Sequence, residues 1–246
     1  MTKSKNMVKV CNLNKHFGAI KAVRGISFEV AKGEVLGFLG PNGAGKSTTM
    51  RMITGFLPPS SGTALVGGYD VITDPIKVKQ QIGYLPENAP AYESMTVANF
   101  LRFSGSIRNF RGSELVDRVD NTIEKCSLQS VRNQTISTLS KGFRQRSCFA
   151  QAILHDPPVL IMDEPTDGLD PNQKHVVREM IQNMASEKAI IISTHILEEV
   201  EAVCTRAIII AHGKVVANGT PNELKEKSST GRLDDVFRML TIEKEA

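Results

Sequence analysis

Residues 40–48 read GPNGAGKST, and this stretch decides which fold the rest of the chain can form. It follows the apolar run VLGFL at residues 35–39 and leads into a helical pattern at residues 48–53. A strand, a glycine-rich loop and a helix in this order provide the context that a phosphate-binding P-loop needs. Glycines allow backbone conformations that side chains would forbid, so the loop N–H groups can wrap a polyphosphate at the helix N-terminus.

The end of this loop carries the side chains of a nucleotide site. Lys46 supplies a positive charge for the β- and γ-phosphates, and Ser47 supplies a hydroxyl for Mg²⁺. A chance lysine in a glycine-rich turn is the alternative, and the flanking strand and helix argue against it. The residues predicted to bind the nucleotide here are Gly40, Pro41, Asn42, Gly43, Ala44, Gly45, Lys46, Ser47 and Thr48.

Length and charge narrow the class of protein. The 246 residues suffice for one large domain or two small ones, and 41% hydrophobic residues are ample for a core. The formal charge of +4 is spread along the chain, with its tightest basic cluster at Lys141, Arg144 and Arg146. A nucleic-acid-binding protein usually shows a clustered basic face, so no nucleic-acid partner is expected.

The cysteine spacing is typical of a reducing compartment, and the hydropathy pattern predicts neither a secretory signal nor a membrane span. The cysteines lie far apart without paired spacing, which argues against a zinc site or a disulfide framework: Cys11, Cys126, Cys148 and Cys204. The opening residues MTKSKNMVKV contain no apolar h-region, so no secretory signal is predicted. No apolar run approaches the ~18–20 residues of a membrane span. A role at a membrane would therefore require a partner.

Apolar runs alternate with helical patterns along most of the chain. The predicted strands are residues 8–13, 26–30, 35–39, 63–66, 82–85, 159–162, 189–193 and 207–210. Helical stretches at residues 48–53, 171–185 and 196–203 separate several of them, which indicates a mainly parallel α/β sheet. Residues 96–154 read as helical, with breaks at Gly112 and at residues 134–140, so we expect a helical insertion in the chain that forms the sheet.

A second motif is expected to complete the nucleotide site. Residues 159–164 read VLIMDE, a buried strand that ends in two acids. Ligands of open α/β sheets bind at the carboxyl ends of the strands, which places these acids beside the P-loop. Asp163 would hold Mg²⁺ directly or through water, and Glu164 would polarise the water that attacks the γ-phosphate. The alternative is a solvated acidic turn before Pro165.

Further motifs carry a resemblance to a known family. Residues 139–146 (LSKGFRQR) resemble the signature loop of ATP-binding cassette (ABC) ATPases, and residues 164–170 (EPTDGLD) resemble their catalytic glutamate and D-loop. Residues 193–195 (STH) match their switch histidine. The resemblance extends over residues 8–224. It implies an α/β fold, a P-loop NTPase core with an inserted helical subdomain and a small antiparallel β region, that uses ATP and Mg²⁺.

The same resemblance assigns residue roles. It implies that Glu164 and His195 are catalytic and that Phe17, in His-Phe-Gly, stacks on adenine. Ser140 and Gly142 would contact a γ-phosphate, and Asp170 would also bind the nucleotide. A lone histidine is more often structural, and the ordered set of motifs favours the switch role for His195.

The sequence departs from the family pattern at the signature and in the Q-loop. Lys141 stands at a glycine position of the usual LSGGQ, and Phe143 replaces its glutamine. Glu87, in GYLPE, stands where the Q-loop glutamine is expected; it can still ligate Mg²⁺ or its water, with an added negative charge. LSKGFRQR, YLPEN and GLDPNQ resemble ATP-binding subunits of ABC-2-type exporters, and the gliding-motility-associated subgroup is the most similar one.

The resemblance also implies a domain division and an assembly. One ABC ATPase domain, residues 1–246, would combine a core (1–86 and 156–226), a Q-loop and helical signature subdomain (87–155) and a short C-terminal tail helix (227–246). Two copies would form a head-to-tail homodimer in which each signature loop meets the other copy's ATP. The dimer would drive a separate integral membrane permease from the cytoplasmic face of the membrane, as a peripheral subunit. Residues 88–95 suit a docking surface or an ordinary surface loop equally.

Two other functions compete with an exporter ATPase. One is a soluble ABC ATPase that acts on ribosomes or DNA; such proteins carry paired cassettes, coiled coils, zinc modules or a basic face, and none is recognisable in this sequence. The other is a regulatory nucleotide-binding module with low turnover. Glu164 and His195 argue against the regulatory module, whereas Glu87 and Phe143 leave it open.

Overall fold

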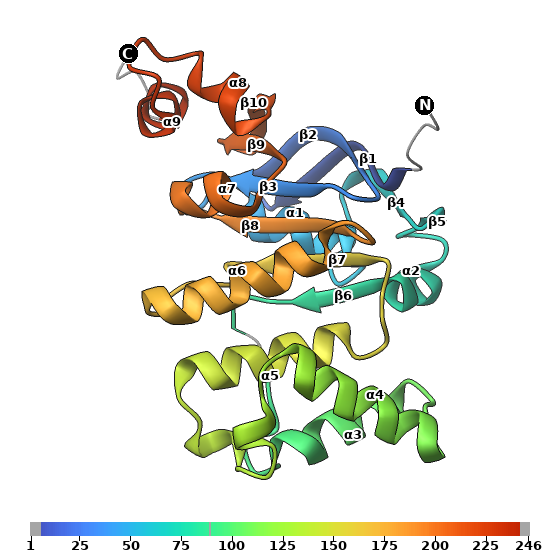
Figure 1. Cartoon of the computed structure of the whole chain (residues 1–246). Helices are drawn as coiled ribbons and strands as arrows, with labels where there is room; N and C mark the ends of the chain where they lie inside the picture. Colours follow the sequence, from blue (N-terminus) through green and yellow to red (C-terminus); the bar gives the residue numbers. More distant parts are fainter. Residues whose placement is uncertain (1–5, 89, 242–246) are drawn as a thin grey trace.

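A six-stranded sheet forms the centre of the computed structural model, which describes residues 6–88 and 90–241. Its strand order is β10–β9–β3–β8–β7–β6, and Figure 1 shows β3, β8, β7 and β6 one below the other. The strands that run parallel are β3 (Val35–Leu39), β6 (Ile82–Leu85), β7 (Val159–Asp163), β8 (Ala189–Thr194) and β9 (Arg206–Ala211). Every residue of β3, β7 and β8 is buried, because both faces of the sheet are covered, one by α1 and an antiparallel sheet and the other by helices. The predicted α/β class is confirmed.

A second, antiparallel sheet has the order β2–β1–β4–β5. Its strands are β1 (Asn6–Phe17), β2 (Ile20–Ala31), β4 (Ser61–Val66) and β5 (Tyr69–Asp70). The first two are longer than the predicted strands 8–13 and 26–30. Main-chain pairing continues into polar segments, up to Phe17 opposite Ile20, and the left-handed φ of +58° at Gly18 closes this hairpin. The extension has no apolar period, so hydropathy alone could not predict it.

Helix α1 (Lys46–Ile53) joins the two sheets. Its buried Met50, Met52 and Ile53 belong to one hydrophobic core with residues of both sheets. On the other face of the parallel sheet, a second core includes residues of α6 (Pro171–Ala185) and α7 (Leu197–Val203). The sequence did not predict α2 (Pro75–Gln81) or the edge strand β10 (Lys214–Gly219), which are short and contain few buried residues.

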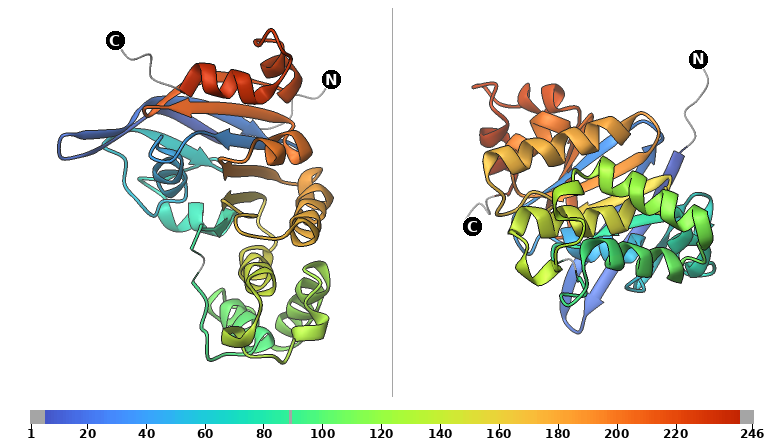
Figure 2. Two further views of the ribbon diagram at one scale, coloured as in Figure 1. Left: turned by 90° about the vertical axis from the view of Figure 1, so that its left-hand side faces the viewer. Right: turned by 60° about the horizontal axis from the view of Figure 1, so that its bottom comes forward.

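Helices α3 (Val97–Ile107), α4 (Gly112–Lys125) and α5 (Lys141–Ile153) pack together at one end of the molecule, away from α8 (Pro221–Lys225) and α9 (Leu233–Thr241) (Figures 1 and 2). The break predicted at Gly112 lies at residues 108–111, directly before that glycine. Helix α3 ends at Ile107, Asn109 follows with a φ of +68°, and Gly112, with a φ of +55°, begins α4. The second break also starts earlier than residue 134, because Ser127 adopts φ +51° just after α4. It contains the short 3₁₀ turns η1 (Gln129–Val131) and η2 (Ile136–Thr138).

The C-terminal segment ends the described chain. Helix α9 lies inside the predicted tail, residues 227–246, of which the last five lie outside the described residues. Among the helices of residues 6–88 and 90–241, none combines the length and the apolar character that crossing a bilayer requires.

Candidate functional site

The loop between β3 and α1 shapes a phosphate-sized cradle. Gly45 precedes α1 with a φ of +103°, and a Cβ there would lie 2.5 Å from the carbonyl oxygen of Ala22, so no other residue fits. Gly43 also adopts a positive φ, of +80°. No side chain of the described residues caps α1. The N–H groups of its first turn have no intrahelical acceptors, which makes this helix end suited to an anion.

Lys46 is the buried cation of this cradle, with its side chain only 6% exposed. Its Nζ donates to the carbonyl oxygens of Gly40, at 2.7 Å, and Pro41, at 3.3 Å. The same Nζ lies 3.8 Å from Oε1 of Glu164. Burial lowers the pKa of Lys46, although the nearby carboxylates of Glu164, Asp163 and Glu87 counteract this effect. A polyphosphate would supply the counter-charge that the surrounding protein provides only in part.

The end of β7 presents the two predicted acids. Asp163 pairs with Ser193 of β8 across the sheet, and the backbone N–H of Glu164 donates to the carbonyl oxygen of Ser193 at 2.8 Å. Glu164 has a φ of +51°, an uncommon backbone conformation for a non-glycine residue. Such strain is frequent where a side chain must be aimed at a functional site. The turn closes with a hydrogen bond from the N–H of Asp167 to the carbonyl of Glu164.

His195 follows β8 and reaches the same acid. Its Nδ1 lies 2.9 Å from Oε2 of Glu164, and its side chain remains 44% exposed toward solvent. The hydroxyl of Thr194 accepts a hydrogen bond from the N–H of Ile196 and holds the turn after the strand. One carboxylate therefore has a buried lysine near one oxygen and a partly exposed imidazole near the other.

The buried side-chain oxygens beside the acids include Asp163 Oδ1 and Ser193 Oγ, which have no hydrogen-bond partner among the described residues. Burial and the charge of Asp163 raise the pKa of Tyr84 to about 12, so its phenol stays protonated. Buried polar atoms are normally satisfied, so these oxygens are placed to contact a metal ion or its water. Oxygen donors are the ligands that Mg²⁺ prefers, and the residues at this position fit that ion.

A cavity of about 540 Å³ opens above the cradle. Its lining includes these predicted residues: Asn42, Gly43, Gly45, Lys46, Ser47, Thr48, Glu87, Glu164 and His195. Ala22 and Asp167 also line it, and the sequence analysis gave neither a role. Asp167 lies within the quoted EPTDGLD motif, which was a usable signal. Ala22 lies on β2, and nothing in its side chain marks it for a site.

The signature residues lie outside this cavity. Ser140 is exposed and caps α5, and its Oγ accepts from the N–H of Phe143 at 3.4 Å. Gly142 is buried, and a Cβ there would come within 2.4 Å of Cδ of Gln173. Asp170 caps α6 by accepting from the N–H of Gln173 at 3.0 Å, which is a structural reason for this acid.

The predicted adenine-stacking residue, Phe17, also lies outside the cavity lining. It occupies the tip of the β1–β2 hairpin, where 49% of its surface is exposed and the Nζ of Lys15 lies 5.3 Å from its ring centroid. The ring is therefore available to a planar group, and the stacking role stays a prediction.

Comparisons with known proteins agree with this geometry. Residues 23–167 match the family model described as ABC transporter. The chain is 38% identical to the ABC transporter ATP-binding protein NatA of Bacillus subtilis over 89% of each chain. It is 34% identical to the Nod factor export ATP-binding protein I of Rhizobium sp., covering 95% of this chain and 77% of that protein.

A solved structure gives the same result. The structure described as an ATP-binding subunit of an ABC transporter superposes with a TM-score of 0.86 at 30% identity, covering 95% of this chain and 99% of that one. The family model, the relatives and the fold all agree with the geometry of the site, in which a P-loop and a buried glutamate line one cavity. The chain belongs to the ABC transporter family, as a subunit that binds and hydrolyses ATP.

Proposed function

We propose that this chain is the ATPase subunit of an exporter, which dimerises around two ATP molecules and drives a separate membrane permease. The observation that carries the proposal is the position of Glu164 between Lys46 and His195 in the cavity that the P-loop lines. A relative at 34% identity has a name that specifies export, which supports an export role over import.

Different residues of the cavity bind the phosphates, orient the attacking water and position the carboxylate that accepts its proton. Lys46 and the loop N–H groups hold the β- and γ-phosphates, and Glu164 orients the attacking water and accepts its proton. His195 lies within contact of Glu164 and keeps that carboxylate in place. Mg²⁺, when bound, offsets the negative charge that the phosphates bring beside two buried acids. The residues that would hold it are Ser47, Asp163 and Glu87, and of these Ser47 and Glu87 line the cavity.

The signature residues act on a second copy of the chain in this proposal. Ser140 is exposed and is not part of the lining of its own chain's cavity. A two-fold axis would bring Ser140 and Gly142 of each copy to the nucleotide of the other. ATP would then favour the closed dimer, and loss of the γ-phosphate contacts would reopen it. The expected place of this cycle is the cytoplasmic face of a membrane, beside the permease.

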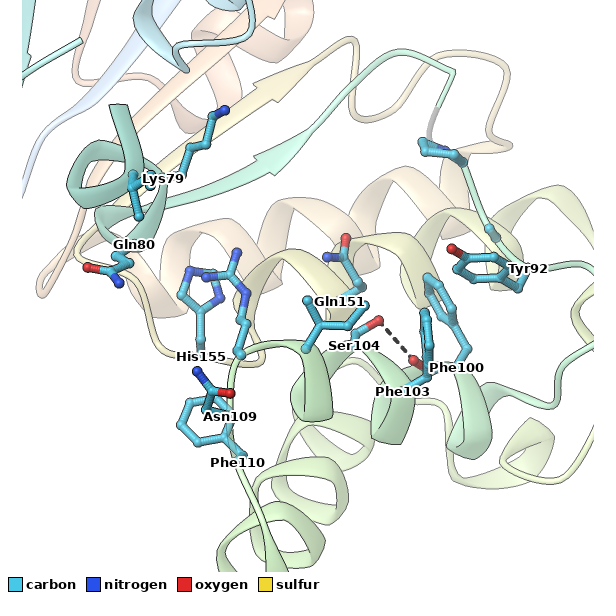
Figure 3. A pocket seen from close by; sticks show the side chains of 15 residues that line it. Lys79, Gln80, Tyr92, Phe100, Phe103, Ser104, Asn109, Phe110, Gln151 and His155 are labelled. Carbon is cyan, nitrogen blue, oxygen red and sulfur yellow. Dashed lines mark hydrogen bonds between the residues drawn. The ribbon is translucent and has the colours of Figure 1, made fainter. Parts of the chain in front are cut away.

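A groove among the helices is suited to receive the permease. It lies between α2, α3 and α5 and has a volume of about 920 Å³ (Figure 3); we call it the helical groove. Glu87 lines the nucleotide cavity, and residues 90–92, a few positions later, line the groove. This places part of the predicted docking segment 88–95 at the groove, whereas residue 89 lies outside the described residues.

Helix α5 provides a second connection between groove and nucleotide. It begins after Ser140 and its other end carries Gln151, which lines the groove. Along its length, Nε2 of Gln145 donates to the carbonyl oxygen of Pro165, next to the catalytic Glu164, at 3.3 Å. A movement of either end would therefore reach the other through one rigid element.

Replacement of Lys46 by alanine is expected to weaken ATP binding by about ten- to a hundredfold, because a charged hydrogen-bond donor to the phosphates is lost. Titration of a fluorescent ATP analogue into both proteins measures this. Lys227→Ala, which removes an exposed lysine outside the cavity lining, is the control and should bind like the unchanged chain. Equal affinity of Lys46→Ala and the control would rule out the P-loop role of Lys46.

Glu164→Gln keeps the shape of the side chain and removes its basicity, so phosphate release should fall by about 10²–10⁴-fold. ATP affinity should not fall, because the substitution removes a negative charge beside the γ-phosphate, and ATP-bound dimers should accumulate. Glu87→Gln is the matched control and should retain activity. If Glu87→Gln abolishes phosphate release while Glu164→Gln leaves it unchanged, the catalytic base is Glu87.

Ser140→Arg should leave ATP binding to the monomer nearly intact and abolish ATP-dependent dimerisation and hydrolysis. The added side chain would occupy the space of the partner's γ-phosphate. Size-exclusion chromatography with and without ATP measures the extent of dimerisation in variants that also carry Glu164→Gln. Ser113→Arg, at an exposed serine on α4, controls for the bulk and charge of the new residue. Dimerisation of Ser140→Arg to the same extent as Ser113→Arg would disprove the role in trans.

A further inference from the structure

The helical groove has two chemically different ends. At one end Tyr92 packs against two aromatic rings of α3, edge-on to Phe103 at 5.1 Å between centroids and tilted to Phe100 at 6.3 Å. Figure 3 shows this aromatic cluster apart from the end that carries His155, Asn109 and Phe110. Tyr92 remains 54% exposed and Ile107 65% exposed. An apolar surface of this kind favours a partner with apolar side chains.

The other end contains a cation without a counter-ion. Arg108, at the C-terminal end of α3, is half-buried, and its guanidinium makes no ion pair or side-chain hydrogen bond with any described residue. Burial lowers the pKa of Arg108 without an opposing acid, yet a guanidinium stays charged at neutral pH. Arg118 on α4 provides a contrast, because Glu114 lies 3.0 Å from its Nε.

The walls around Arg108 offer no acid. It lines both the helical groove and an adjoining cavity of about 270 Å³, and among the described residues that line either one, none is Asp or Glu. Lys79 also lines both spaces and adds a second positive charge. Burial and the charge of Arg108 lower the pKa of His155 to about 4, so this imidazole is neutral at pH 7. A half-buried charge left unpaired is costly, which favours an occupant that neutralises it.

We propose that the helical groove recognises a permease segment in which a carboxylate pairs with Arg108 and neighbouring apolar side chains cover Tyr92, Phe103 and Ile107. This inference rests on the proposed function and specifies the chemistry of its partner. The two ends of the groove bind different groups, so the segment can dock in only one direction. Arg108 would then distinguish acidic from neutral segments, because a neutral segment in the groove would leave the arginine covered and unpaired.

The test uses the complete chain with a fluorescent reporter in the groove. The sequence contains no tryptophan, so Tyr92→Trp places a single indole at the aromatic end. A phage-displayed library of random peptides is selected against this protein, and the recovered peptides are titrated while indole fluorescence is followed. Peptides that combine an Asp or Glu with apolar residues are expected. Recovery of no groove-binding peptide, or of peptides without an acid, would overturn the proposal.

Two comparisons assign the affinity to the carboxylate and to Arg108. Replacing the acid of a selected peptide by its amide should weaken binding by about tenfold or more, and Arg108→Gln should do the same to the acidic peptide only. Arg108→Lys should retain part of the affinity. Lys79→Gln removes the same formal charge from an exposed position and should cost about threefold or less. Equal effects of Arg108→Gln and Lys79→Gln would contradict a specific pair.

Two further measurements, ATP hydrolysis and vesicle binding, distinguish this inference from a failure of the proposed function and from a lipid occupant. Basal ATP hydrolysis should be unchanged in Arg108→Gln, because Arg108 does not line the nucleotide cavity. Absence of hydrolysis in the unchanged chain would refute the proposed function, whereas normal hydrolysis without acid-dependent peptide binding would refute only the groove chemistry. Vesicles of anionic or neutral lipid are also titrated into the Tyr92→Trp protein while indole fluorescence is followed. An indole response to anionic vesicles and not to acidic peptides would identify a lipid occupant and overturn the proposal.

Discussion

The buried ammonium of Lys46 is the charge around which the nucleotide site is organised. A cation at 6% exposure is stable only with compensating groups, and here they are two loop carbonyls and the carboxylate of Glu164. The parallel pairing of β3, β8 and β7 brings these groups together, since it aligns the ends of three strands at one edge. The chain after each strand then contributes one functional residue: Lys46 at the start of α1 after β3, His195 after β8 and Glu164 after β7.

The proposed transport cycle depends on short connections from that edge to the helical end of the molecule. Residue 87 lies at the nucleotide cavity and residues 90–92 lie at the helical groove, within one stretch of chain. The ion pair between Arg144 and Glu93, at 3.2 Å, ties this stretch to α5, which begins at the signature residue Ser140. In the proposed cycle, occupancy of the groove and contact with a second nucleotide would therefore act on the same two elements and couple the permease to ATP.

The parts that the sequence predicted are those in which apolar pattern and glycine chemistry decide the structure. The buried strands β3, β7 and β8 and the P-loop are of this kind. The extensions of β1 and β2, the edge strand β10 and helix α2 were not predicted, because partner strands and local contacts hold these segments. In the site, Lys46, Glu164 and His195 converge as their motifs indicated, and their catalytic roles stay predictions. Ala22 carries no signal, and Arg108 becomes noticeable only when its missing counter-ion is seen in the fold.

The central claim is that each ATP lies between Lys46 of one copy and Ser140 of another. The position of the γ-phosphate in an experimental structure of Glu164→Gln with ATP and Mg²⁺ tests it most directly. We expect a two-fold dimer with two nucleotides, each γ-phosphate in contact with Lys46 of one copy and Ser140 of its partner. A γ-phosphate bound by Lys46 while Ser140 of every copy faces solvent, or bound by both residues of a single chain, would contradict it.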